Sequence, residues 1–146
     1  MKPGIDYVGV TISFYCNDGK GKFLFHKRSK NCRDEVGRWD CGGGQLEFGE
    51  DPIDGVLREV REEYGCKGII QEQLPAHSII RFQNKIKTHW LAIPFFIKVN
   101  PKDVKNNEPN KIDEIKWFRL NNLPTPLHTG FKYSNKRYSD YFKKYR

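Results

Sequence analysis

The sequence lacks the features of a membrane-spanning, exported or disulfide-linked protein. Its longest strongly apolar run, residues 90–97, has eight residues and includes a proline, whereas a membrane helix needs about 20. The first six residues form no apolar signal core, so we expect no export and no membrane partner. Only four cysteines are present, and no two of them form a CxxC pair. We therefore expect neither a zinc site nor a disulfide framework, but reduced thiols in a cytoplasmic protein.

The sequence has fewer acidic than basic residues. The 146 residues carry 26 Lys and Arg against 18 Asp and Glu, a formal net charge of +8. This excess favours an anionic partner such as a nucleotide, a polyphosphate or a nucleic acid. Part of it lies in residues 128–146, where six cationic residues accompany a single acid, Asp140. An aromatic content of 14% argues against disorder, and the length suits one domain over 1–146.

Hydrophobic patterns predict a chain of mixed α and β structure. One helix is strongly indicated, because Asp51 can cap it, Pro52 fits its first position and Gly65 can end it. Runs rich in Val, Ile and aromatic residues predict strands, and Pro94 indicates an edge or a bulge in one of them. The predicted strands are 7–16, 22–27, 69–82, 88–99 and 112–120, and a last amphipathic helix carries Tyr138, Tyr141, Phe142 and Tyr145.

The predicted helix gathers three acids on one side. Glu59, Glu62 and Glu63 share a face, because positions i, i+3 and i+4 lie together on a helix. Like charges there repel, and Arg58 and Arg61 lie to the side. One interpretation is a solvated acidic face; the other is a site for a hard cation, since carboxylate oxygens suit Mg²⁺ or Mn²⁺. The apolar stripe beside these acids consists of Ile53, Val56, Leu57, Val60 and Tyr64.

Glycines precede this helix and also occur inside it. The cluster Gly42-Gly43-Gly44 lets the backbone approach a ligand or metal without a side chain in the way. Gly55 lies within the helix, where glycine costs about 1 kcal/mol relative to alanine. Either space for a ligand or a closely packed neighbouring loop would explain this residue.

The spacing of these features resembles the Nudix box, GX5EX7REUXEEXGU. Gly44 is followed after five residues by Glu50 and after seven more by the segment 58–66. Every fixed polar and glycine position is present, and Val60 fills the first bulky aliphatic place. Cys66 replaces the last aliphatic residue, and Gly42 stands where a proline is usual. The resemblance implies an α/β fold of Nudix type, an α/β/α sandwich around a mixed β-sheet.

The resemblance also implies a reaction, the hydrolysis of a nucleoside diphosphate linked to another group, with Mg²⁺ or Mn²⁺ as cofactor. By position in the motif, Glu59, Glu62 and Glu63 would be metal ligands, with Glu62 or Glu63 near the attacking water. Arg58 would orient these acids. The carbonyl of Gly44 would be a further metal ligand. Metal ions would neutralise the anionic substrate and lower the pKa of a bound water.

Support for this site is expected from outside the helix. Glu50 would be an outer metal ligand or a partner of Arg58. Many members of the family recruit one more acid from a late strand or loop. Glu114 is the first candidate for it and Glu108 the second, and for both the alternative is an ordinary surface acid.

The residues that would recognise the substrate carry weaker signals. The block 43–50, which includes Glu47, is similar to MutT-like nucleoside triphosphate pyrophosphatases, which release a monophosphate and pyrophosphate, some from oxidised or modified nucleotides. Trp39 could stack on a base, although strand aromatics are more often core. Arg28, Arg33 and Gly37 match half of a coenzyme A pyrophosphatase signature; the alternative is a basic loop that contacts phosphates in any member of the family.

Other functions stay open at this point. Coenzyme A, ADP-ribose, another dinucleotide or capped RNA would be alternative substrates of the same box. A function of another class is an RNA-binding or regulatory Nudix module without catalysis. Its feature would be the basic aromatic tail 131–146, although the aromatic spacing there also fits a helix that packs on the core. The sequence leaves the oligomeric state open, a dimer included.

Overall fold

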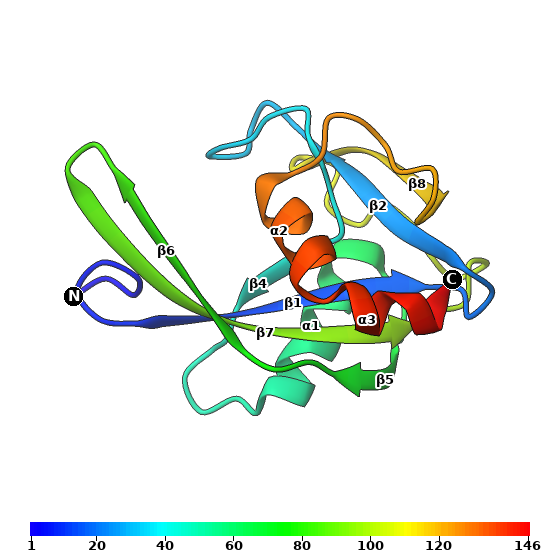
Figure 1. Ribbon diagram of the computed structural model, residues 1–146, viewed down its shortest axis with the longest axis horizontal. Helices are drawn as coiled ribbons and strands as arrows, with labels where there is room; N and C mark the ends of the chain where they lie inside the picture. Colours follow the sequence, from blue (N-terminus) through cyan, green and yellow to red (C-terminus); the bar gives the residue numbers. More distant parts are fainter.

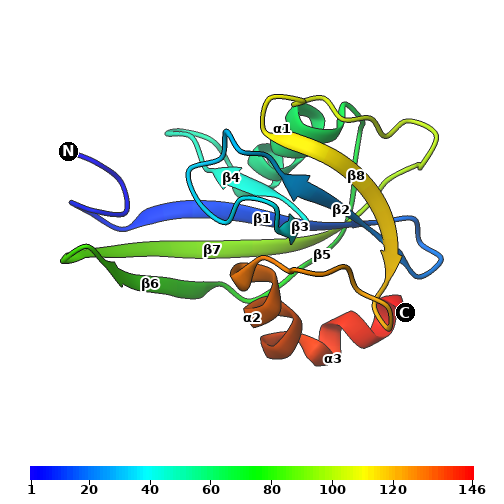
Figure 2. The same cartoon turned by 90° about the horizontal axis from the view of Figure 1, so that it is seen from above.

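One mixed sheet separates two helical layers. In the computed structural model, which describes residues 1–146, α1 covers one face of the sheet and α2 and α3 cover the other (Figure 2). The predicted α/β/α sandwich is confirmed. The strands are β1 (Gly9–Asn17), β2 (Lys22–Arg28), β3 (Trp39–Asp40), β4 (Gly43–Gln45), β5 (Ile69–Gln73), β6 (His77–Gln83), β7 (Ile86–Lys98) and β8 (Ile112–Arg119). The helices are α1 (Pro52–Tyr64), α2 (Thr129–Arg137), α3 (Ser139–Phe142) and a final 3₁₀ turn, η1 (Lys143–Tyr145).

The parallel pair β1 and β7 forms the centre of the sheet. Its register runs from Gly9 opposite Trp90 to Asn17 opposite Lys98. All other neighbours are antiparallel: the order is β3-β2-β1-β7-β5, with β4 also on β1, β6 on β7 and β8 on β2. Beyond the body of the sandwich, β6 and β7 continue as a projecting hairpin (Figure 1). The central strands, covered on both faces, therefore form the rigid base of the molecule.

Two prolines shape the strands around β7. The segment predicted as one strand over 69–82 is divided into β5 and β6, and Pro75, which has no N–H to donate, lies in the break. Of the two explanations predicted for Pro94, an edge or a bulge, the edge is excluded, because β7 has neighbours on both sides. The Pro94 carbonyl accepts the Leu74 N–H at 2.9 Å, in the break between β6 and β5. A residue without an N–H is tolerated where the ladder changes partner.

Each face of the sheet has its own hydrophobic core. Side chains alternate along β1, so Ile12, Phe14 and Cys16 face α1, whereas Tyr15 faces the C-terminal helices. In α1 the buried stripe is narrower than predicted, because Ile53 is 44% exposed. The second core contains Phe131, Tyr138 and Phe142 from the tail, and the Tyr145 ring stacks on Phe96 with ring centroids 4.2 Å apart. The tail aromatics thus belong to the core, and they are not free to stack on bases.

The ends of α1 form as predicted. The Asp51 carboxylate accepts the Ile53 N–H at 2.9 Å, and Gly65 ends the helix in the left-handed region at φ 65°. No helix in the structure combines the length and the apolar character needed to span a bilayer. All four cysteines are free thiols, as predicted.

A buried histidine links the sheet to α1. His26 on β2 is 4% exposed, and its Nδ1 lies 2.7 Å from the Tyr64 hydroxyl. That hydroxyl donates its single proton to the Cys41 carbonyl at 2.7 Å, so Nδ1 of His26 is the donor in the pair. Burial lowers the pKa of His26 from 6.5 to about 4. The folded protein therefore holds this ring neutral.

This histidine should make the fold sensitive to acid. Because its pKa is lower in the folded chain, the unfolded chain takes up the proton first as the pH falls through 6.5. The free energy of unfolding should drop between pH 6.5 and pH 4, by up to about 3 kcal/mol from this group alone. Urea unfolding of the wild type and His26→Gln across this interval measures the effect. The variant should lose less stability than the wild type, and the surface variant His89→Gln should follow the wild type; equal losses in all three would contradict the assignment.

Candidate active site

One arginine on α1 gathers the acids of the motif. Arg58 contacts Glu50 through two hydrogen bonds, from Nε to Oε2 at 2.7 Å and from Nη2 to Oε1 at 2.9 Å. Its Nη1 donates to Glu59 at 2.9 Å and to Glu62 at 3.2 Å. Bonding to Arg58 lowers the pKa of Glu50 to about 2. The planar guanidinium, with five N–H donors, thus connects the loop after β4 to the acidic side of the helix.

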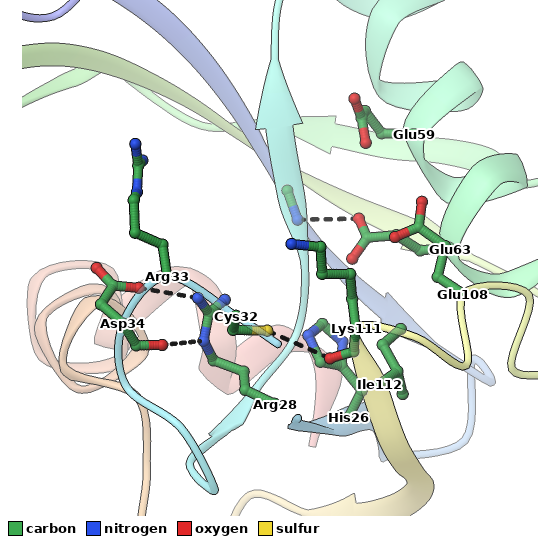
Figure 3. A pocket seen from close by; sticks show the side chains of 11 residues that line it. His26, Arg28, Cys32, Arg33, Asp34, Glu59, Glu63, Glu108, Lys111 and Ile112 are labelled. Atoms are coloured by element: carbon green, nitrogen blue, oxygen red, sulfur yellow. Dashed lines mark hydrogen bonds and ion pairs between the residues drawn. The ribbon is translucent and has the colours of Figure 1, made fainter. Parts of the chain in front are cut away.

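A cavity of about 470 Å³ opens beside these acids, between α1 and two loops (Figure 3). Three carboxyl groups line its helix side, those of Glu59, Glu63 and Glu108. The third acid of the helix, Glu62, has a side chain that is 49% exposed, and it is not among the lining residues. Two of the three helix acids therefore face the cavity, and an acid from a distant loop joins them.

Glu63 is the most deeply buried of these acids. It is 8% exposed, and the only hydrogen bond to its carboxyl group comes from the Gly43 N–H at 3.3 Å. Burial raises the pKa of its carboxyl well above the usual range, and the charges of Glu59 and Glu108 raise it further. Burial also raises the pKa of Glu59, against the opposing effect of Arg58, and that of Glu108. A buried carboxylate without a cation is costly, so this site favours a bound cation or a proton.

Strand β4 brings its backbone against the helix acids because it has no side chains there. A Cβ atom at Gly44 would fall on the Glu59 carboxyl group, and one at Gly42, where φ is +125°, would fall on the Phe14 ring. The Gly44 carbonyl accepts the Thr11 hydroxyl at 3.0 Å. Glycine is needed at position 55 for a different reason, because a side chain there would meet Leu46, Glu50 and Ile12. For Gly55 the packed-loop explanation is the correct one.

The loop between β7 and β8 delivers Glu108. Its neighbour Asn107 caps the end of α1, donating from Nδ2 to the carbonyls of Glu62 at 3.1 Å and Arg61 at 3.3 Å. The Asn107 N–H also donates to the Glu63 carbonyl at 3.0 Å. These bonds hold the loop against the last turn of the helix, which places Glu108 next to Glu63 in the cavity (Figure 3).

Glu114, ranked first in the sequence analysis, does not reach the cavity. Its neighbours Ile115 and Trp117 pack toward the core beneath α1, and alternation along β8 turns Glu114 to the other face. There it is exposed and pairs with Lys116 at 3.6 Å. The ranking of the two late acids is therefore corrected in favour of Glu108. The hydrogen bonds that position Glu108 leave no local pattern in the sequence.

Cations line the loop side of the cavity. Arg28 and Arg33, both predicted, are joined by Lys111, to which the sequence analysis gave no role. Arg28 is engaged by Asp34, at 2.9 Å from Nη2 to Oδ1. His26, also without a predicted role, lines the cavity as well.

The two remaining substrate candidates do not line the cavity. Trp39 is 8% exposed and packs edge-on against Phe118, with ring centroids 5.4 Å apart, so it is a core residue. The Glu47 side chain is 65% exposed and lies 3.7 Å from Arg58. A sequence pattern could not show that Trp39 and Glu47 lie outside the cavity. Which residues line it depends on contacts between loops that are distant in the sequence.

The acids have the right chemistry for a hard cation but are not assembled around one. No three His, Cys, Asp or Glu side chains in the structure form a ready metal-binding group. Arg58 holds the carboxylates of Glu59 and Glu62 by ion pairs. Carboxylate oxygens from α1 and from the loop of Glu108 nevertheless form the donor set that Mg²⁺ or Mn²⁺ prefers.

Known proteins share this fold and this motif. The family model described as NUDIX domain matches residues 8–141. The chain is 30% identical over 110 residues to an RNA pyrophosphohydrolase of Gluconacetobacter diazotrophicus, covering 66% of this chain and 65% of that protein. It is 30% identical over 76 residues to the CTP pyrophosphohydrolase of Escherichia coli, covering 52% of this chain and 56% of that protein. The chain thus spans about half to two thirds of the length of these relatives.

A solved structure agrees with these relatives. The MutT protein of Methanosarcina mazei Go1 superimposes with a TM-score of 0.73 at 27% identity, covering 93% of this chain and 96% of that one. The match therefore extends over both helical layers and the sheet between them, well beyond the 23 residues of the motif. The family model covers most of the chain, and the chain belongs to the Nudix family.

Proposed function

We propose that this chain is a metal-dependent hydrolase that cleaves a nucleoside triphosphate, ordinary, modified or oxidised, into a monophosphate and pyrophosphate. The observation that carries the proposal is the buried carboxyl of Glu63, which faces the cavity beside Glu59 and Glu108 without a cation partner. Membership of the Nudix family supports it, as do two relatives named pyrophosphohydrolases.

The residues that would hold Mg²⁺ or Mn²⁺ are Glu59, Glu62, Glu63 and the Gly44 carbonyl, with Glu108 as the acid from outside the box. A bound ion would neutralise phosphate charge and lower the pKa of a coordinated water. Glu62 or Glu63 would take a proton from the attacking water. Arg58 would act on orientation, because it already holds Glu59 and Glu62 by hydrogen bonds. The strand of glycines lets the substrate approach the backbone.

The alternative of a non-catalytic RNA module has less support. Its feature was the basic aromatic tail, and the tail aromatics lie in the second core. Coenzyme A, ADP-ribose, other dinucleotides and capped RNA are alternatives that a substrate panel separates from the proposed triphosphate.

The products should identify the bond that is cleaved. With Mg²⁺ or Mn²⁺, a nucleoside triphosphate should give the monophosphate and pyrophosphate, and chelation of the metal should abolish turnover. Chromatography of the nucleotide products, with separate assays for pyrophosphate and orthophosphate, measures this. Parallel reactions contain coenzyme A, ADP-ribose, a dinucleoside polyphosphate and 5′-capped RNA. Orthophosphate as the first product, or a higher kcat/KM for any of these four substrates, would reject the proposal.

Neutralising the buried acid should separate catalysis from folding. Glu63→Gln keeps the shape of the side chain and removes a charge that burial disfavours, so the melting temperature should stay the same or rise. The value of kcat should fall by about 100-fold or more, because metal binding and proton transfer each contribute to the rate. Glu59→Gln should behave similarly.

The matched control is Glu114→Gln, which changes a glutamate on the opposite face of the sheet. It should keep kcat within about twofold, the range expected of a surface substitution that costs at most about 0.5 kcal/mol. Near-wild-type kcat in Glu63→Gln would show that the catalytic assignment is wrong.

The arginine should matter through geometry as well as charge. Arg58→Lys keeps the positive charge but cannot bond Glu50 through two parallel donors while also holding Glu59. We expect a loss of about 1–3 kcal/mol of stability and a fall in kcat of about tenfold or more. Urea unfolding and steady-state kinetics measure the two effects. Arg61→Lys, on the exposed side of the same helix, is the control and should change neither.

A further inference from the structure

The outer edge of β6 is unpaired. This strand pairs with β7 alone, and it forms the rim of the hairpin that projects from the body of the molecule (Figure 2). Its residues, His77–Gln83, include no proline, no glycine and no acid, and its pairing with β7 has no bulge. Proteins usually protect an open edge with such features or with charges, because an open edge binds further strands. In β6 only Arg81 offers this protection.

Large apolar side chains are exposed along this edge. Ile80 is 55% exposed and Phe82 is 72% exposed. Because these residues are two positions apart on one strand, their side chains share a face of the sheet, together with that of Ser78. An exposed apolar surface of this kind marks an interaction site.

The turn of the hairpin determines which backbone groups of β6 point outward. The chain reverses through Asn84-Lys85, with φ of +51° and +66°, which is a two-residue turn of type I′. In such a hairpin the flanking pair, Gln83 and Ile86, exchanges two hydrogen bonds, and every second pair along the ladder does the same. The residues between these pairs direct their N–H and C=O groups away from β7. On β6 they are Ser78, Ile80 and Phe82.

We infer that the edge of β6 is a dimer interface, at which two copies of this chain pair their β6 strands antiparallel about a two-fold axis at Ile80. In this register Ile80 lies opposite Ile80 of the second copy, and Ser78 lies opposite Phe82. Every outward-directed residue then belongs to a pair that exchanges two backbone hydrogen bonds. The exposed apolar side chains of the two copies meet on one face of a continuous sheet. A contact of this symmetry closes on itself, so it produces a dimer and no filament.

Charge and hydrogen bonding both select this register. A two-fold axis at Arg81 would place the two arginines opposite each other, which destabilises a strand pair. An axis at Ile79 would place Phe82 opposite Ala76, which lies outside β6 and leaves outward-directed groups unpaired. With the axis at Ile80, Arg81 lies opposite the aliphatic side chain of Ile79. The strand is thus complementary to itself in the register that uses all of its open edge.

The dimer should be weak and should respond to salt in a characteristic direction. A contact made by one pair of strands is small, and interfaces below about 1,200 Å² are typical of transient complexes. Each copy has a net charge of +8, so long-range repulsion opposes association until salt screens it. The dimer should therefore tighten as NaCl rises from about 0.05 to about 0.5 M. An anionic partner bound to the cations of the hairpin would instead be released by salt.

Sedimentation equilibrium of the full chain tests the interface. Between about 1 µM and about 1 mM protein, the wild type should show a reversible monomer–dimer equilibrium. Ile80→Lys places two lysines opposite each other at the axis and should raise the Kd of the dimer by about tenfold or more. The matched control is Ile86→Lys, because Ile86 is 49% exposed on the same hairpin but belongs to β7. Its Kd should stay within about twofold of that of the wild type. A wild type that is monomeric throughout, or an unchanged Kd in Ile80→Lys, would overturn the interface.

A charge exchange at the axis separates the interface from a folding defect. Ile80→Glu alone should also dissociate, because two glutamates then oppose each other. An equimolar mixture of Ile80→Lys and Ile80→Glu should form a heterodimer at least about tenfold tighter than either variant with itself, and salt should weaken it. Mixing cannot repair a hairpin that fails to fold. Absence of this heterodimer would reject the axis at Ile80, and none of these measurements depends on the proposed hydrolysis.

Discussion

The contact between α1 and the two glycines of strand β4, Gly43 and Gly44, is the constraint on which the cavity depends. The helix packs Val56, Val60 and Tyr64 into the core beneath it, and that packing sets its distance from the sheet. At this distance Glu59 has no room for a side chain on Gly44 opposite. The acids therefore stand directly over a bare backbone. A Cβ on Gly44 would therefore displace the Glu59 carboxyl group.

The repulsion among the carboxylates of α1 is relieved for some of them and not for Glu63. Several carboxylates on one helix side repel each other, and Arg58 relieves Glu50, Glu59 and Glu62 by direct hydrogen bonds. Glu63 points inward, out of its reach, and keeps its repulsion with Glu59 and Glu108. The protein thus stabilises the outer acids by itself and leaves the inner one dependent on what enters the cavity. The buried carboxylate of Glu63 lowers the stability of the folded protein at the position where we propose that catalysis occurs.

Loops distant in sequence complete the site because each is tied to a rigid element. Asn107 holds the loop of Glu108 to the end of α1, and the Ser29 and Asn31 contacts join the other loop to it. The same contacts that bring Glu108 to the cavity also bring Lys111 to it. One loop that contacts two partners therefore supplies both an acid and a cation to the cavity.

Much of this protein could be read from local pattern. The caps of α1, its acidic side, the glycine cluster and the tail aromatics depend on neighbours within a few residues, and spacing reports such relations directly. Motif spacing was likewise enough to indicate the family, because the box is one strand, one loop and one helix in succession. Local pattern was thus enough to identify the acids on α1 and the arginine among them.

Tertiary structure decided which residues outside the box share the cavity with those acids. Glu108 and Glu114 are similar in sequence terms, but only the first is held against α1, and strand alternation turns the second to the far face. Lys111 carried no signal, because its position depends on a backbone contact with a loop 79 residues away. Trp39 was equally ambiguous until the second core closed over it. Sequence spacing measures distance along the chain, whereas these residues are selected by contacts between segments that only the folded chain brings together.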